Sequence, residues 1–233
     1  MRHVMNIPSA AEIAEGVRQF NATFGEMERA LWCLSKAARA DLLQRQSSPI
    51  LEGLVWTIKG WWGVQGVRLE IKSIMAQALN MNQWTPELFE DSSDLVPEAE
   101  RFACDQVVGL VTVSTKLGAQ RYEISLASKV LHWLMPWRIP VYDSFVRRGA
   151  GIPTSMAPLN AYQLIVASEF DAARRLSSEG SDWIGNIQPR SPFRALDKYM
   201  WWISGGNSGR ALAVRDPWRI VRQLGLRPNL VGS

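Results

Sequence analysis

The sequence has few of the side chains that bind metals or form cross-links. It contains two cysteines, Cys33 and Cys104, and two histidines among 233 residues. These four side chains are scattered and none has the short spacing of a zinc site. So few cysteines do not make a disulfide framework, and we expect two buried free thiols. Neither a P-loop nor a dinucleotide fingerprint occurs, so we predict no metal and no other cofactor.

The sequence also lacks long apolar runs and a strong charge of either sign. No stretch reaches the ~18 apolar residues of a membrane span, and the first residues contain no apolar core of a signal peptide. We therefore expect a cytoplasmic protein that does not enter a membrane. The formal charge is +4 and the isoelectric point is about 9.3. Such a mild surplus permits an anionic partner without requiring one.

Helical periodicity is present along most of the chain. Ser9 is a predicted helix cap, followed by Ile13, Val17 and Phe20 on one helical face. The run at 107–114, rich in valine and threonine, has no partner strand, and we interpret it as buried helix or loop. Residues 84–110 are predicted to form acidic loops around short helices. Further helices are expected over 9–46, 49–60, 67–81, 122–136, from 143 or 144, 159–180, 191–206 and 215–229.

The segment IPVYDSFVRR at 139–148 contains the strongest candidate for chemistry. Pro140 favours an extended approach, and Asp143 stands where the cap of the following helix belongs. A carboxylate at a helix start stays ionised and is held in place by backbone amides. Taken alone, this position is explained by helix capping. A catalytic carboxylate is the other interpretation.

The context of Asp143 resembles the helix-hairpin-helix DNA glycosylases. An apolar helix (ISLASKVLHWL) leads through a short loop with proline to PVYDSFVRR, which is similar to the family segment that carries the catalytic aspartate. Upstream, the helix and break in LEGLVWTIKGWWGVQGVRLEIKSIM look like the family segment that fills the gap left by a flipped base. Downstream, FRALDKYMWW is similar to a closing helix. The resemblance covers residues 50–204.

This resemblance implies roles for individual residues. Asp143 would stabilise the positive charge on the sugar and orient or deprotonate the attacking water. Trp61, Trp62 and Tyr142 would stack on the extruded base, and Gln65 or either tryptophan would fill the gap in the duplex. Arg147 and Arg148 would hold flanking phosphates.

The sequence departs from the family pattern in two places. The family hairpin usually reads Gly-x-Gly, whereas KLGAQRYEIS has only Gly118, so Lys116 and Arg121 would contact phosphate instead. Members with lyase activity have a lysine where this chain has Ser125, which cannot form a Schiff base. Lys129 lies one turn further along and is predicted to be a phosphate contact or a surface charge.

The helical periodicity, with only one β-like run, predicts an all-α fold of two helical lobes around a cleft, similar to the fold of the helix-hairpin-helix DNA glycosylases. We expect a single glycosylase-like unit over 1–233, made of N-terminal helices (1–48), the core (49–204) and a basic tail (205–233). The predicted function is monofunctional base excision from double-stranded DNA by a monomer. Two alternatives stay open: a non-catalytic nucleic-acid-binding module of the same fold, and a helical interaction protein.

Overall fold

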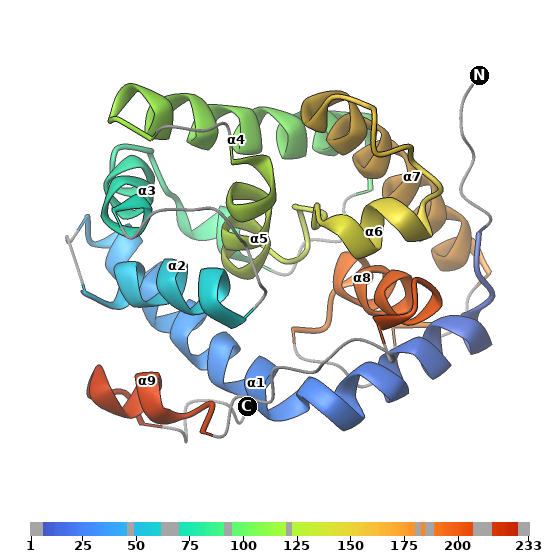
Figure 1. The fold of residues 1–233 in the computed structure, drawn as a ribbon, viewed down its shortest axis with the longest axis horizontal. Helices are drawn as coiled ribbons and strands as arrows, with labels where there is room; N and C mark the ends of the chain where they lie inside the picture. Colours follow the sequence, from blue (N-terminus) through green and yellow to red (C-terminus); the bar gives the residue numbers. More distant parts are fainter. Residues whose placement is uncertain are drawn as a thin grey trace. The chain divides into compact units, whose positions relative to one another are not determined.

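The structure is a computed structural model, and it describes residues 7–45, 49–61, 70–90, 95–119, 123–179, 183–184, 189–206 and 216–227. Within these ranges all regular secondary structure is helical, which confirms the all-α class (Figure 1). The helices are α1 (Ala10–Leu43), α2 (Pro49–Trp61), α3 (Ile71–Asn80), the short 3₁₀ helix η1 (Pro86–Phe89), α4 (Pro97–Lys116), α5 (Ile124–Leu134), α6 (Ser144–Gly149), α7 (Pro158–Ser178), α8 (Pro192–Ile203) and α9 (Arg219–Gln223).

Local sequence signals set where several helices begin. At the start of α1, the Ser9 amide donates to Glu12 Oε2 (2.8 Å) and the Glu12 amide donates to Ser9 Oγ (3.3 Å), a reciprocal capping box. The run at 107–114 is helical, as one of its two interpretations predicted. The expectation of only short helices over 84–110 is wrong, because that run continues α4 to a length of 20 residues.

The chain divides into two compact units. The first comprises Met1–Gly25, Ser92–Gln106 and Pro136–Ala211, and the second comprises Glu26–Asp91, Val107–Met135 and Leu212–Ser233. Each unit is built from three separate stretches, and both α1 and α4 contribute to both units. The boundaries predicted at residues 48 and 204 do not coincide with these divisions.

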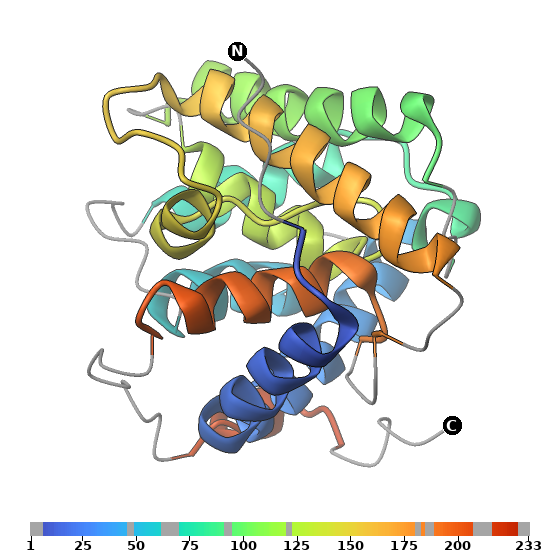
Figure 2. The ribbon, with the colours of Figure 1, turned by 90° about the vertical axis from the view of Figure 1, so that its right-hand side faces the viewer.

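Helix α8 forms the centre of the first unit. Every residue from Pro192 to Trp201 is buried, and α6, α7 and α8 contact one another (Figure 2). A Cβ atom on Gly16 of α1 would lie 2.8 Å from Tyr199 Cα, so these two helices approach at backbone distance. Because α8 is buried on all sides and contacts α6, it helps to hold α6 in place.

In the second unit, α2 contacts α3 and α5. The tail helix α9 packs through Val221 against Ala30 and Cys33 of α1. Both cysteines are free, as predicted; Cys33 is buried and Cys104 partly buried. None of the described helices combines the length and apolar character needed to cross a bilayer.

Candidate functional site

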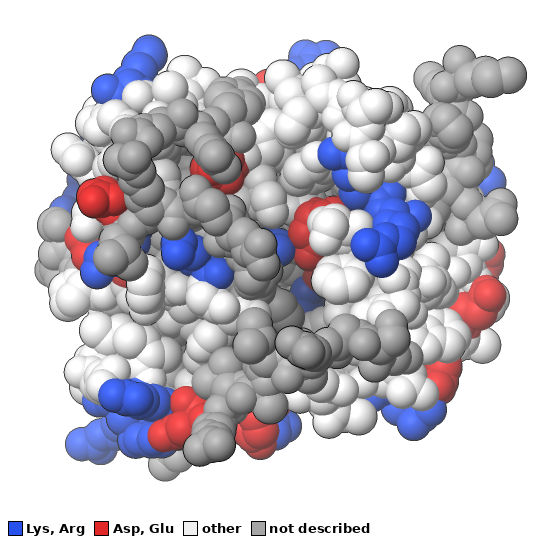
Figure 3. All heavy atoms as spheres, viewed as in Figure 1, with Lys and Arg blue, Asp and Glu red and all other residues white. Residues whose placement is uncertain are grey.

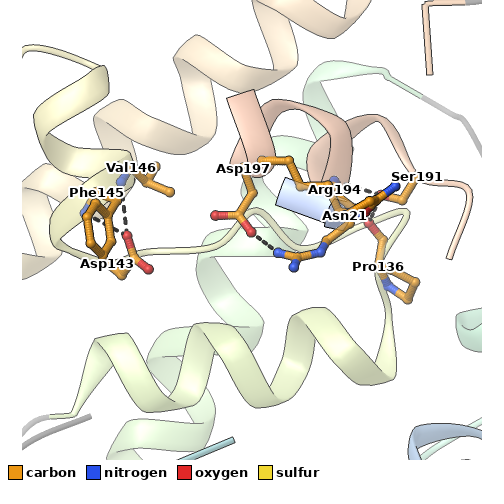
Figure 4. Close-up of polar contacts among 9 residues, drawn as sticks. Asn21, Pro136, Asp143, Phe145, Val146, Ser191, Arg194 and Asp197 are labelled. Atoms are coloured by element: carbon orange, nitrogen blue, oxygen red, sulfur yellow. Dashed lines mark hydrogen bonds and ion pairs between the residues drawn. The ribbon is translucent and has the colours of Figure 1, made fainter. Parts of the chain in front are cut away.

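Asp143 caps α6 through one carboxylate oxygen. Its backbone is extended (φ −152°, ψ −175°), and its Oδ1 accepts hydrogen bonds from the amides of Phe145 (2.8 Å) and Val146 (2.9 Å) (Figure 4). The second carboxylate oxygen points away from these amides in Figure 4. The predicted helix start is therefore confirmed. The cap fixes the orientation of the half-buried carboxylate before any substrate arrives.

The loop before Asp143 and the helix after it are both anchored. Ser191 Oγ donates to the carbonyl of Pro136, just after α5, and accepts from the Arg194 amide (3.2 Å) as the cap of α8. Arg194 forms a buried ion pair with Asp197 one turn along the same helix (Figure 4). These contacts hold the segment that begins at Pro136 against the start of α8 and so fix the first part of the chain that leads to Asp143.

Helix α6 is attached to the C-terminal end of α8. Ser204 Oγ donates to the carbonyl of Phe145 (2.8 Å), and Arg148 Nη1 donates to the carbonyl of Ser204 (3.0 Å). A Cβ atom on Gly149 would lie 2.6 Å from Met200 Sδ, which shows how closely the two helices pack. With only six residues, α6 owes its stability to these contacts and to the Asp143 cap.

Arg147 makes internal contacts in this structure. Its Nη1 donates to Tyr142 Oη (3.0 Å), and its Nη2 donates to the carbonyls of Met156 (2.8 Å) and Pro153. Tyr142 is itself buried and meets Tyr162 edge-on, with ring centroids 6.2 Å apart. A phosphate at Arg147 would compete with these carbonyls, and a base at Tyr142 would require the ring to be uncovered. Both assignments stay predictions.

Arg148 is the predicted phosphate contact whose position in this unit best suits that role. It is exposed, and its guanidinium lies over the Phe145 ring, 5.7 Å from the centroid. One nitrogen bonds the Ser204 carbonyl, which leaves other donors of the fork for an anion. Arg148 and Asp143 belong to the same short α6 segment.

Glu169 of α7 is a buried carboxyl that the sequence analysis did not identify. It is 1% exposed, and neither carboxylate oxygen has a hydrogen-bond partner among the described residues. Burial raises the pKa of the Glu169 carboxyl well above its usual value, and the nearby charge of Asp143 raises this pKa further. Both causes favour the neutral, protonated form of the Glu169 carboxyl over its charged form. The candidate site thus contains two carboxyl groups: Asp143, held by backbone amides, and Glu169, buried near it.

A sequence signal for Glu169 exists. The buried face of α7 repeats at helical spacing, and Glu169 occupies one of its positions between residues that pack into the core: Tyr162, Ile165, Val166, Phe170 and Ala173. An acidic residue in such a face is unusual. Its proximity to Asp143 depends on tertiary packing and was not predictable.

The remaining predicted residues belong to the second unit or lie outside the described residues. Trp61 ends α2, is half-buried, and packs against the cluster formed by Ala30, Cys33 and Val221. Lys116 is exposed at the end of α4. Trp62, Gln65 and Arg121 lie outside the described residues.

The structure corrects one expectation for α5. Lys129, which we expected to be a phosphate contact or a surface charge, is only 6% exposed. Nearly all residues of α5 are buried, and Lys129 is buried with them. It is therefore not a surface charge. Ser125, on the same helix, is half-buried, and its carbonyl accepts from Ser128 Oγ (3.2 Å).

Basic side chains do not form one continuous surface on the face drawn in Figure 3. Among the described residues on that face, Lys and Arg lie in separate small groups with Asp and Glu between them. Nor do the described His, Cys, Asp and Glu residues gather into a group of three or more that could hold a metal ion.

Comparisons with protein families, with curated proteins and with solved structures find no significant match for this chain. The function is therefore inferred from the geometry of the chain itself.

Proposed function

We propose that this chain is a monofunctional DNA glycosylase with a helix-hairpin-helix-like fold, which acts as a cytoplasmic monomer on double-stranded DNA. It would hydrolyse the N-glycosidic bond of a damaged or modified base that has been rotated out of the helix. One observation carries the proposal: the carboxylate of Asp143 is held by two backbone amides at the start of α6, directly after the proline-containing loop that follows α5.

The chemistry requires a fixed negative charge. As the bond between C1′ and the base nitrogen breaks, the base leaves with the electron pair and positive charge builds on the sugar. Asp143 stabilises that charge through space. Water then adds to C1′, and Asp143 accepts the proton that this water loses; transfer of that proton to the departed base anion completes the hydrolysis and restores the Asp143 carboxylate. The raised pKa of Glu169 disfavours a second negative charge near Asp143.

The proposed substrate class includes bulky modified bases. The chain contains 11 tryptophans, and aromatic rings provide stacking surfaces for planar bases. Hypermodified pyrimidines of phage DNA belong to this class, and their removal would make the protein an antiviral factor. We assign Trp61, Trp62, Gln65 and Tyr142 to the base pocket or the wedge. The proposed phosphate contacts are Lys116, Arg121, Arg147 and Arg148, with Arg148 the first to test; the buried Lys129 is not among them.

A non-catalytic nucleic-acid-binding module is the second candidate. It is favoured by the fact that capping alone accounts for Oδ1 of Asp143. In this case the fold would bind DNA, and Asp143 would contribute only to stability.

Base release distinguishes these candidates. The protein is incubated with duplexes that each carry one modified base, and free base and abasic sites are measured. We expect release from at least one duplex, with strand cleavage only after alkali and no adduct trapped by borohydride, because α5 has Ser125 in the position of the lyase amine. DNA binding without release from any duplex would favour the binding module. The absence of both would leave the helical interaction protein.

A further inference from the structure

Helix α2 exposes one tryptophan on the side opposite its buried face. Trp56 is 40% exposed. The other side of the helix is buried through Leu51, Leu54, Val55 and Ile58. The rest of the side chain is buried, so part of the ring is accessible to a partner.

Two lysines from different helices converge on this ring. Lys59 Nζ of α2 lies 5.1 Å from the Trp56 ring centroid, and Lys72 Nζ of α3 lies 5.6 Å from it. Neither lysine forms an ion pair with an acidic side chain in the part of the chain that the structure describes. The surface formed by Trp56, Lys59 and Lys72, called the Trp56 platform below, thus combines an exposed ring with two uncompensated positive charges.

These two properties match a nucleotide that is not base-paired. A base presents a flat π-face for stacking, and its phosphates carry the charges that lysines neutralise. In a duplex the base faces are already stacked on their neighbours, so only an unpaired strand offers both groups to one platform. We propose that the Trp56 platform binds single-stranded DNA, with one base stacked on Trp56 and adjacent phosphates on Lys59 and Lys72.

This proposal is independent of base excision. The Trp56 platform lies in the second compact unit, whereas Asp143 lies in the first. Loss of strand binding on variants of the platform, and loss of base release on variants of Asp143, are separate measurements. Failure of either proposal leaves the other intact.

The test is the binding of a fluorescent oligothymidine of about 12 nucleotides, within the roughly 4–16 nucleotides typical of one single-strand platform. Anisotropy titrations over a series of salt concentrations compare the parent with Trp56→Ala, Trp56→Phe, Lys59→Gln and Lys72→Gln. Arg101→Gln is the matched control, because Arg101 is an exposed cation on α4 that belongs to the first compact unit and not to the platform. Thermal melts check that each variant is folded.

We expect Trp56→Ala to weaken binding on the order of tenfold and Trp56→Phe to retain most of the affinity, because stacking needs a ring. Each lysine variant should lower the magnitude of the slope of log K against log salt by about 0.7, and Arg101→Gln should leave this slope unchanged. Equal affinities for the parent and Trp56→Ala would overturn the proposal, as would a parent that does not bind at low salt. Tighter binding to the same sequence in duplex form, or to heparin, would also overturn it.

Discussion

Asp143 combines two properties that a single substitution can separate: its shape, which caps α6, and its charge. Asparagine keeps the oxygen that accepts from Phe145 and Val146, so Asp143→Asn should change the free energy of unfolding by only about 1 kcal/mol or less. Loss of the charge removes one preorganised interaction with the developing cation and should lower the rate of base release by roughly 10²–10³. Melting temperature, DNA affinity and base release are measured side by side.

The control for this prediction is Asp171→Asn. Asp171 is also on the first unit, but it lies on the surface of α7 and pairs with Arg175 at 3.1 Å. This variant should match the parent in all three measurements. If Asp143→Asn releases base at the parent's rate, Asp143 is a cap only, and the catalytic assignment is wrong.

Glu169 makes stability depend on pH with a definite sign. Because burial raises its pKa in the folded state, the folded protein holds a proton that the unfolded chain releases above about pH 4.3. The contribution of this proton to the free energy of unfolding is complete below that pH. It decreases by about 1.4 kcal/mol per pH unit as the pH rises toward the raised pKa. Glu169→Gln removes this dependence of stability on pH. The melting temperature of the variant should therefore exceed that of the parent by a growing margin as the pH rises from 4 to 8.

Two aspartate variants test this assignment of the pH dependence to Glu169. Asp143 is the second cause of the raised pKa, so Asp143→Asn should lower this pKa, and the loss of stability should end at a lower pH than in the parent. Asp171→Asn, on the exposed side of α7, should leave this pH unchanged. A constant difference in melting temperature between Glu169→Gln and the parent at every pH would show that Glu169 is not protonated in the folded protein.

At the scale of elements, the close approach of α1 and α8 depends on one glycine. A Cβ on Gly16 would meet the backbone Cα of Tyr199 at 2.8 Å, whereas a Cβ on Gly25 of the same helix would meet only Asn21 Cβ at 3.9 Å. Gly16→Ala should therefore lower the free energy of unfolding by about 1–2 kcal/mol, because overpacking exceeds the gain in helix propensity.

Gly25→Ala is the matched variant, since it has the same propensity gain without the clash, and it should raise the free energy of unfolding by up to about 1 kcal/mol. Denaturant titrations of both variants give the two values. Equal stabilisation by both substitutions would show that α1 and α8 can separate without cost.

Local signals predicted the elements well. Ser9, Asp143 and the proline at the start of α8 mark helix starts that the structure confirms, because capping acts within one turn of the chain. The burial of Lys129 and the proximity of Glu169 to Asp143 were not predictable in this way. Each depends on which helices pack around it, and that information is spread over residues distant in sequence.

At the scale of the whole molecule, helical periodicity was sufficient to predict the fold class but not the division of the chain. The predicted segments were contiguous, whereas each compact unit combines three separate stretches. Periodicity reports which face of a helix is buried and not which partner buries it. The candidate site shows the same limit: Asp143 was predicted from its own segment, while the acid beside it comes from α7.

The division into units leads to a prediction about unfolding. Helices α1 and α4 each run through both units without a break, so neither unit can be separated by cutting the chain at one point. Unfolding one unit would remove the packing that stabilises half of each of these helices, and isolated helical segments of that length are marginal in water. We therefore expect one cooperative transition, with coincident curves by tryptophan fluorescence and circular dichroism and equal calorimetric and van't Hoff enthalpies.

Gly16→Ala, which acts in the first unit, should shift both curves together. Two separate transitions, only one of which moves in this variant, would show that the units unfold independently.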